Sequence, residues 1–370
     1  MSGSQDRHVD PERALLSGEG AGQRTGEGNE RFPVRSHRTE HGSPDDAAAG
    51  DGGTTYYDQP LLKEPIWIWS VPAYFYVGGV TSGAAIVGAV AQLADRRGLD
   101  RLIRRSRWLA GGGAAVSTLL LIIDLGRPAR FLNMLRVFRP SSAMSVGSWA
   151  LAATASAAGA SAVLPAVGAR RLGDAAGLGA GALAPVLGTY TAVLLSDTAV
   201  PLWQATRTSL PRFFAASATV ATASALELFP ALDAREEAIA RRLGMAAKVA
   251  DLVCGEQVQH QADEVARVGR PLHEGASGAL WRTAKLSTAT SLAVSLVPVP
   301  ARWRVARRIL SAVLGSIGSL AGRFAVFHAG KRSTRDPRAT FVQQRAGRGA
   351  AAMDGLAGVT GPAGRRATDA

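Results

Sequence analysis

Residues Asp124–Trp149 read DLGRPARFLNMLRVFRPSSAMSVGSW, and this stretch connects two long apolar segments. The apolar run 108–123 ends at Asp124, and a run without ionisable residues begins at Ser142. Between the two runs, apolar side chains alternate with four arginines, which are Arg127, Arg130, Arg136 and Arg139. Connections between helices are usually short and polar, whereas this one is long, basic and apolar. It therefore indicates a segment that lies along the boundary between a membrane and water.

Two runs are long enough to cross a bilayer, because residues 70–93 and 142–169 contain no charged residue. A transmembrane helix needs about 20 predominantly apolar residues. The 370-residue chain carries a net charge of +13, which we assign mainly to loops and tails that orient the protein and contact anionic lipid. No basic domain lies free of the membrane, so nucleic-acid binding is not expected. The sequence predicts an all-α membrane protein in a lipid bilayer.

The pattern predicts about eight transmembrane helices within a membrane domain at 59–330, between a disordered polar tail at 1–58 and a basic disordered tail at 331–370. Trp67 and Trp69 precede the first span as interfacial anchors, and Gly79 and Gly83 allow a neighbouring helix to approach closely. The expected spans are 70–93, 108–124, 142–167, 176–203, 212–232, 238–259, 281–299 and 307–328. The sixth contains five charged residues and could equally be an amphipathic helix on the membrane surface.

The distribution of arginines favours an N-terminus outside the cell. Residues 95–107 contain six arginines. When each loop is counted together with the first five residues of the next span, the loops after the third, fifth and seventh spans hold two, three and four. The loops after the even-numbered spans hold about four, two and three. Basic residues concentrate in cytoplasmic loops, which supports this orientation, although the basic C-terminal tail argues for the opposite one.

Metal ligands are scarce in this sequence. Cys254 is the single cysteine, so the chain cannot assemble an iron–sulfur cluster or a thiolate-bound zinc site. Apart from His260 after the sixth segment, only His328 of the six histidines lies next to a predicted span, and a membrane haem held by two histidines is therefore not expected. Phosphate-binding glycine loops and nucleophile elbows are also absent from the sequence. If electrons pass near this protein, another subunit carries the redox centres.

Four ionisable residues lie at or near membrane depth, and such residues are costly there unless they have a function or a partner. They are Asp124, Asp197, Glu227 and Arg323. Asp124 and Glu227 lie near span ends, where simple solvation is an equal alternative. Arg323 could be a counter-charge in packing. The arginines after Asp124 could bind lipid phosphates, contact an acidic partner surface, or pair with Asp124 to form a polar pocket.

Five stretches resemble the NrfD/PsrC family, which supplies the integral-membrane subunit of polysulfide-reductase-like and related molybdoenzyme complexes. They are YDQPLLKEP (57–65), VPAYFYVGG (71–79), the stretch 124–149, YTAVLLSDTAVPLW (190–203) and RFAVFHAGK (323–331). The resemblance implies eight helices in two four-helix bundles of a prokaryotic plasma membrane protein, with no haem or iron–sulfur cluster in this chain. It also implies a ferredoxin-like partner with four-iron clusters and, beyond it, a molybdopterin catalytic subunit.

The same resemblance implies that the chain exchanges electrons between a quinone, either menaquinone or ubiquinone, and that partner. Mapped onto this sequence, the candidate quinone-binding residues are Trp69, Tyr74, Asp124, Arg130 and Tyr190. The candidate proton-path residues are Asp197 and Glu227, and the candidate partner-docking residues are Arg127, Arg136 and Arg139. Two alternatives stay open: a structural membrane anchor without quinone turnover, and a proton or solute channel.

Overall fold

The computed structural model describes residues 62–127 and 129–345, with the side chains of Ala129, Arg130, Leu132 and 342–345 excepted. The predicted tail 1–58 and most of the predicted tail 331–370 lie outside these residues. Across the described part, the chain forms helices and no strands, so the all-α prediction is confirmed. The long helices of this part are α2 (Ser70–Asp95), α3 (Asp100–Leu125), α5 (Ala143–Val163), α6 (Arg170–Ser196), α8 (Leu210–Glu227), α9 (Ala234–Asp263), α11 (Gly275–Leu296) and α12 (Arg304–Ser333). The short ones are α4 (Ala129–Met134), η3 (Leu164–Val167), α7 (Pro201–Ala205), α10 (Ala266–His273), η4 (Ala301–Trp303) and α13 (Pro337–Arg345).

Five helical segments of the described part are long and apolar enough to cross a membrane. They are α2, α3, α5, α6 and the segment Ala301–Ser333, which contains α12. This finding supports a membrane protein with several spans. Helices α8, α9 and α11 do not meet the same criterion, so the count of eight spans stays a prediction.

The structure corrects two predicted helix boundaries. Helix α3 begins at Asp100 rather than at 108, because the arginine-rich segment before the apolar run is itself helical. The predicted fourth span, 176–203, is too long: α6 ends at Ser196, and α7 begins at Pro201 after a non-helical turn. Proline has no N–H group and disfavours helix in the residue before it, and Val200 accordingly has an extended backbone with ψ of 119°. At the C-terminal side, α12 and α13 extend the ordered chain beyond Gly330, where we placed the domain boundary.

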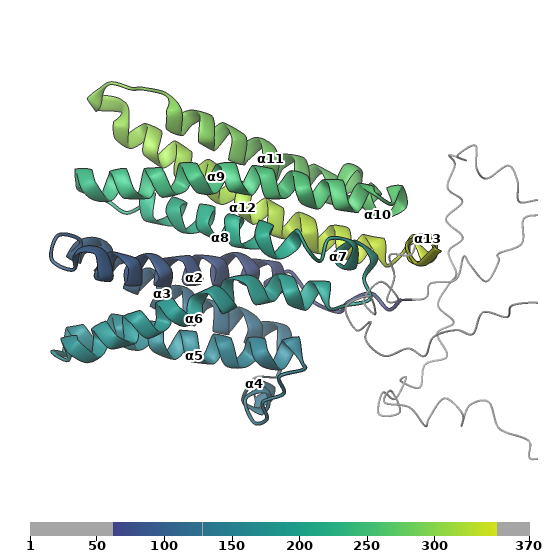
Figure 1. Cartoon of the computed structure of the whole chain (residues 1–370), viewed down its shortest axis with the longest axis horizontal. Coiled ribbons are helices and arrows are strands. Elements are labelled where there is room, and N and C mark those ends of the chain that lie inside the picture. The colour runs from purple at the N-terminus through teal and green to yellow at the C-terminus, as the bar shows by residue number, and fades with distance from the viewer. Residues whose placement is uncertain (1–61, 128, 346–370) are drawn as a thin grey trace, which may run out of the picture. The chain divides into compact units, whose positions relative to one another are not determined.

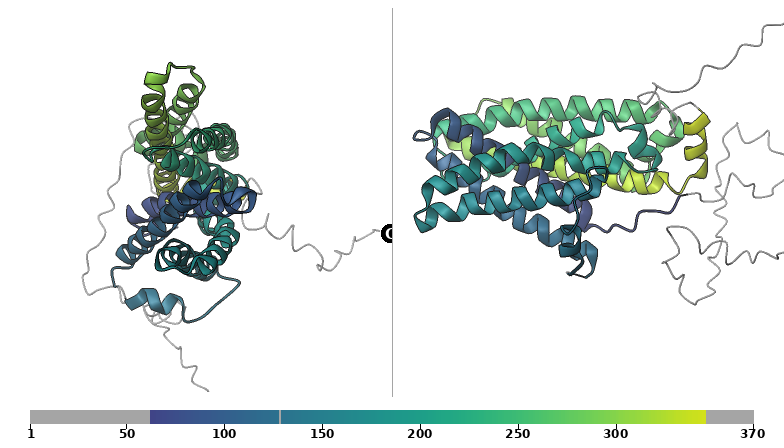
Figure 2. Two further views of the ribbon diagram at one scale, coloured as in Figure 1. Left: turned by 90° about the vertical axis from the view of Figure 1, so that its left-hand side faces the viewer. Right: turned by 60° about the horizontal axis from the view of Figure 1, so that its bottom comes forward.

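Helix α2 contacts helices on both sides of the described unit. It packs against α3 and α6 on one side and against α8 and α12 on the other. Helix α5 packs against α3 and α6, while α9 and α11 pack beside α8 and α12, as the views in Figure 1 and Figure 2 show. The close approach of α2 and α8 depends on glycine: a Cβ on Gly79 would lie 3.0 Å from the Cβ of Ala218, and one on Gly83 would overlap Thr222.

The connections between long helices gather at two ends. We call the end with the α2–α3, α5–α6, α8–α9 and α11–α12 connections the arginine end; it lies on the left of Figure 1. We call the other end, where α2 begins and α12 ends, the α4 end. Large aromatic side chains are buried toward the α4 end, including Tyr74, Trp203, Phe213 and Phe327, whereas a smaller core of alanines lies between α2, α3, α5 and α6.

Candidate functional site

An apolar pocket of about 260 Å³ lies at the α4 end, where the chain enters α2. Helices α2, α3, α4, α5 and α6 and the segment before α2 all contribute to its walls. Its polar lining residues are Tyr74, Asp124, Ser148 and Tyr190. The other lining residues are apolar: Trp67, Val71, Phe75, Leu121, Leu125, Phe131, Met134, Met144, Leu151 and Leu194. Three of the five residues predicted to form a quinone site therefore line one pocket.

The hydroxyl groups of Tyr74 on α2 and Tyr190 on α6 form a hydrogen bond with each other. Tyr74 is almost fully buried, with 2% of its surface exposed, and a buried phenol needs such a partner because its hydroxyl has lost water. One hydroxyl donates a hydrogen bond to the other, and the second hydroxyl can then donate a hydrogen bond to a further acceptor. The pair therefore presents a hydrogen-bond donor to an apolar pocket.

A glycine on α5 leaves the space that Tyr190 occupies. A Cβ atom on Gly147 would overlap the ring of Tyr190, so any larger residue would displace this ring. Gly147 belongs to the helix that follows the basic stretch 126–142. Ser142 caps this helix by accepting a hydrogen bond from the backbone N–H of Ser145. The start of α5 is thus fixed beside the tyrosine pair.

Asp124 lies in the last turn of α3 and is partly buried. A negative charge is unfavourable at the C-terminal end of a helix, and here the backbone N–H of Ile68 compensates by donating to Asp124 Oδ1 at 3.2 Å. This bond attaches the entrance of α2 to the end of α3. Gly126 ends α3 with a left-handed φ of 66°, a conformation that glycine adopts without strain. The hydrogen bond from Ile68 thereby keeps the Asp124 carboxylate at the edge of the pocket.

Trp67 lines the pocket, whereas the predicted Trp69 does not. The Trp69 side chain is 59% exposed. The indole of Trp67 stacks on that of Trp203, with ring centroids 6.0 Å apart, and Lys331 Nζ donates to the Trp67 carbonyl at 3.2 Å. The sequence predicts both Trp67 and Trp69 as interfacial anchors. Residues two apart in a non-helical entry segment cannot be assigned to the pocket or to the surface until tertiary contacts form.

The basic stretch contributes apolar side chains to the pocket and arginines to the surface. Phe131 and Met134 of α4 line the pocket, and α4 lies outside the packed helices, next to the start of α5 (Figure 1). Arg127, Arg136 and Arg139 are exposed and form no ion pair with described residues. The side chain of Arg130 lies outside the described part, so its predicted contact with a quinone stays a prediction.

The two predicted proton-path residues lie far from each other. Asp197 is exposed in the turn after α6, at the α4 end. Glu227 is at the other end of α8, where it is only 3% exposed and its Oε2 atom has no hydrogen-bond partner among the described residues. The structure brings neither residue into the pocket of Tyr74 and Tyr190.

Glu227 instead belongs to a second group of buried polar residues, which lies between α8, α9, α11 and α12. Lys248 is 1% exposed, and its Nζ atom donates to Ser311 Oγ at 2.7 Å and to Ser295 Oγ at 3.0 Å. Asp251 follows one turn later on α9 and accepts from Thr288 Oγ1 at 3.4 Å. We missed this group in the sequence, although the i, i+3 spacing of Lys248 and Asp251 places both on one helix face.

Arg323 on α12 completes this buried group. Its Nη2 donates to the Phe214 carbonyl at 2.7 Å, and its guanidinium lies 3.8 Å from the centroid of the Phe214 ring. Its Nε and Nη1 atoms are buried without a hydrogen-bond partner in the described part. Asp251 is near enough to act on this guanidinium electrostatically. Arg323 is thus buried within this group, and its interpretation as a counter-charge in packing stays a prediction.

The described residues contain no group of three or more His, Cys, Asp and Glu side chains that could hold a metal ion. The expectation that this chain carries no haem or iron–sulfur cluster stays a prediction. A family model described as polysulfide reductase, NrfD_2, matches residues 54–258. The chain belongs to the NrfD polysulfide reductase family. No curated protein matches it.

Membership in the NrfD family indicates that the chain is the membrane subunit of a larger, polysulfide-reductase-like complex. The matched region contains every residue that lines the apolar pocket, and it ends within α9. Helices α11 and α12 lie beyond it. The pocket therefore belongs to the part of the chain that the NrfD family shares, whereas two of the four helices around Lys248, α11 and α12, lie outside that part.

Proposed function

We propose that this NrfD protein anchors an oxidoreductase complex in the membrane and exchanges electrons between a quinone pool and an iron–sulfur partner. The observation that carries the proposal is the Tyr74–Tyr190 pair, which presents a hydroxyl donor to an apolar pocket with Asp124 at its edge. A quinone ring is apolar apart from its two carbonyl oxygens, and each oxygen needs a hydrogen-bond donor.

The pocket suits such a ring in its lining, and its volume is close to the usual range of ligand sites. Its volume of about 260 Å³ is just below the range of roughly 300–1,000 Å³ that is typical of pockets for small molecules. The walls are mostly aliphatic and aromatic, with few polar groups, which is the usual composition of a ligand site. Since α2, α3, α5 and α6 are candidate spans, a molecule dissolved in lipid has a short route to it.

The chemistry that a quinone supplies is the uptake or release of two electrons and two protons. The tyrosine pair holds a carbonyl oxygen by donating a hydrogen bond and fixes the orientation of the ring. Asp124 exchanges protons between the pocket and water at the membrane boundary, because a carboxylate can accept a proton and a carboxylic acid can return it. The electrons pass to or from the partner subunit, whose clusters we place next to the α4 end.

The decisive experiment measures quinol oxidation and quinone reduction by the purified complex. We expect Tyr190→Phe and Asp124→Asn to lower turnover by about tenfold or more each, since a lost hydrogen bond to a buried group costs roughly 1–3 kcal/mol. Trp69→Phe is the matched control, because Trp69 is exposed and lies outside the pocket. Full activity of both variants in an intact complex would show that this pocket does not take part in quinone turnover, and the chain would then be a structural anchor.

A second candidate function, a proton path, is favoured by the buried group around Lys248. Glu227, Asp251 and Arg323 each keep buried polar atoms without a partner among the described residues, and buried water is the usual way to satisfy such atoms. A small pocket of about 10 Å³ next to Glu227 also includes Arg241 and Arg308 and has room for about one water molecule. We place the entrance of the proposed path here, at the arginine end.

The proton path is tested by reconstituting the complex in vesicles that contain a pH-sensitive dye. We expect the internal pH to change during quinol turnover, and we expect Glu227→Gln and Lys248→Met to abolish the change. Arg302→Gln, an exposed residue at the same end, should have no effect. Turnover without any change in internal pH in the unmodified complex would reject this candidate.

We further propose that the α4 end lies outside the cell. The six arginines of residues 95–107 lie at the opposite end, and basic loops stay in the cytoplasm. Labelling of cysteines introduced at Arg139 and at Arg302, in a Cys254→Ser background, tests this orientation. A membrane-impermeant thiol reagent applied to intact cells should label the first position and not the second.

A further inference from the structure

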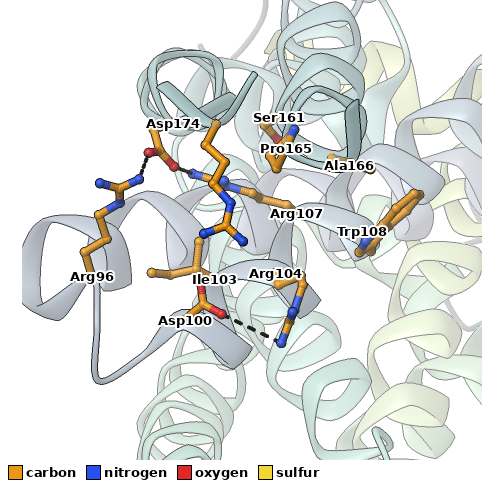
Figure 3. Close-up of a pocket in the computed structure, with 12 residues that line it drawn as sticks. Arg96, Asp100, Ile103, Arg104, Arg107, Trp108, Ser161, Pro165, Ala166 and Asp174 are labelled. Carbon is orange, nitrogen blue, oxygen red and sulfur yellow. Dashed lines mark hydrogen bonds and ion pairs between the residues drawn. The ribbon is translucent and has the colours of Figure 1, made fainter. Parts of the chain in front are cut away.

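A second pocket, of about 220 Å³, lies at the arginine end, far from the pocket of Tyr74 and Tyr190 (Figure 3). The turn between α2 and α3, the first two turns of α3, and the connection from α5 through η3 to α6 surround it. Its charged lining residues are Arg96, Arg104, Arg107, Arg170, Asp100 and Asp174. Four guanidinium groups and two carboxylates leave an excess of two positive charges.

The carboxylates are not evenly shared among these arginines. Asp174 forms ion pairs with both Arg96 and Arg107, and the Nη2 atom of Arg107 lies 2.8 Å from Asp174 Oδ1. Arg104 has only Asp100, at 3.7 Å, and both of these side chains are more than 60% exposed. Such a pair contributes little.

Arg170 has no carboxylate partner among the described residues. Its guanidinium lines the same pocket as that of Arg104. These two cations are therefore available to a ligand, whereas Arg96 and Arg107 are already paired with Asp174.

One side of this pocket is apolar. The apolar lining residues of the pocket are Ile103, Trp108, Ala162, Pro165 and Ala166, and Figure 3 shows Trp108 and Ala166 on the side away from Arg96 and Asp174. The indole of Trp108 is 53% exposed. It stands where the arginine-rich turns of α3 change into an apolar run, and tryptophan is enriched at this level of a membrane. The pocket thus combines a cationic rim with an apolar wall at the depth of lipid headgroups.

We propose that this pocket binds an anionic phospholipid, with the phosphate between Arg104 and Arg170 and the acyl chains along Trp108. Arginine binds phosphate with two parallel hydrogen bonds, which makes it well suited to this group. Basic pockets between membrane helices on the cytoplasmic side are suitable sites for lipid headgroups. The apolar wall favours a lipid over a free phosphate ion, because a free ion gains nothing from Trp108. This proposal requires a membrane location and does not depend on the quinone pocket.

The test measures retained lipid by native mass spectrometry of the full-length protein, after exchange into detergent with equal amounts of phosphatidylglycerol and phosphatidylcholine. We expect retention of phosphatidylglycerol. The double variant Arg104→Gln/Arg170→Gln should lose it by roughly tenfold or more, since each charged hydrogen bond contributes about a factor of ten. Arg302→Gln/Arg304→Gln is the matched control: it removes the same charge from exposed residues of the arginine end outside this pocket, and it should retain the lipid.

Three outcomes would overturn the proposal. They are equal retention of the two lipids, equal loss in the two double variants, and displacement of the lipid by millimolar inorganic phosphate. The last would show a site for a free anion. Arg104→Lys/Arg170→Lys keeps the charge and loses the paired hydrogen bonds, so intermediate retention would support the assigned geometry. A melting temperature within the range of the control confirms that the variant proteins are folded.

Discussion

The hydroxyl of Tyr74 on α2 is hydrogen-bonded to the hydroxyl of Tyr190 on α6, although 116 residues separate them in the chain. The bond joins two candidate membrane spans beside the pocket that also includes Asp124. It can form only because α5 presents a glycine, Gly147, to the ring of Tyr190. The position of the two hydroxyl groups therefore depends on the packing of α2, α5 and α6 together.

Gly147→Ala should disturb the tyrosine pair without changing any polar group. The added Cβ would overlap the Tyr190 ring, and forcing a methyl group into a packed site costs typically 1–3 kcal/mol. We expect a lower melting temperature and slower quinol turnover than in the unmodified complex. Both are measured on the purified complex, by thermal unfolding and by a quinol oxidation assay.

The control for this variant is Gly159→Ala on the same helix. A Cβ at Gly159 would have nothing within 4 Å, and alanine favours helix over glycine by up to about 1 kcal/mol. Gly159→Ala should therefore leave activity unchanged and keep or raise the melting temperature. Equal activity in the two variants would show that the position of the Tyr190 ring does not matter for turnover.

Glu64 attaches the segment before α2 to the end of α12. Arg335 Nε lies 2.9 Å from Glu64 Oε2, and Lys331 Nζ lies 3.3 Å from Glu64 Oε1. Burial by itself raises the pKa of the Glu64 carboxyl. The hydrogen bonds from Arg335 and Lys331, together with the charges of these two residues, lower the pKa by more, so that it lies below its ordinary value of 4.5. Because the folded pKa is depressed, Glu64 stabilises the fold above pH 4.5, and this contribution is lost as the pH falls through the folded pKa.

Glu64→Gln should therefore lower the melting temperature at pH 7, and the difference from the unmodified protein should shrink as the pH falls below about 4.5. The effect should be small, at most about 1 kcal/mol, since Arg335 is largely exposed to solvent. Adding Arg335→Gln to Glu64→Gln should cause little further loss if the two residues act as a pair. A difference independent of pH would contradict the role of this ion pair.

Arg323→Met should destabilise the protein, because it removes a buried cation that acts electrostatically on the buried Asp251. It also leaves the buried Phe214 carbonyl without the hydrogen bond from Arg323, and a buried group that loses its partner costs roughly 1–3 kcal/mol. Adding Asp251→Asn should restore part of the loss. Arg304→Met, an exposed change in the first turn of the same helix, should have little effect. Unfolding in mixed micelles measures all four proteins, and equal losses in the single and double variants would show that Asp251 and Arg323 are not coupled.

Arg136→Glu should weaken binding of the partner subunit, because it reverses a charge on the exposed surface next to the pocket. We expect less partner to copurify, and the difference from the unmodified protein should shrink as the salt concentration rises, because salt screens the interaction of the exposed charges. Arg302→Glu makes the same change at the arginine end. A loss of partner from Arg302→Glu alone would place the partner at the arginine end and contradict its placement next to the α4 end.

Local features of the sequence determined the helical elements and much of the pocket. Uncharged runs long enough to cross a bilayer predicted α2 and α5. Tyr74, Asp124 and Tyr190 were identified through their resemblance to family motifs, and the structure brings them to one pocket. Such features are readable because hydrophobic length and backbone preferences act within one segment.

Only the tertiary structure decided which polar residues meet. The sequence offered Asp197 and Glu227 as one proton path, yet they lie at opposite ends of the helices, and Glu227 instead joins Lys248 and Asp251. Likewise, Trp67 rather than Trp69 lines the pocket. Contacts between side chains on different helices depend on the rotation and approach of those helices, and these are fixed by packing across the whole unit rather than by any one segment.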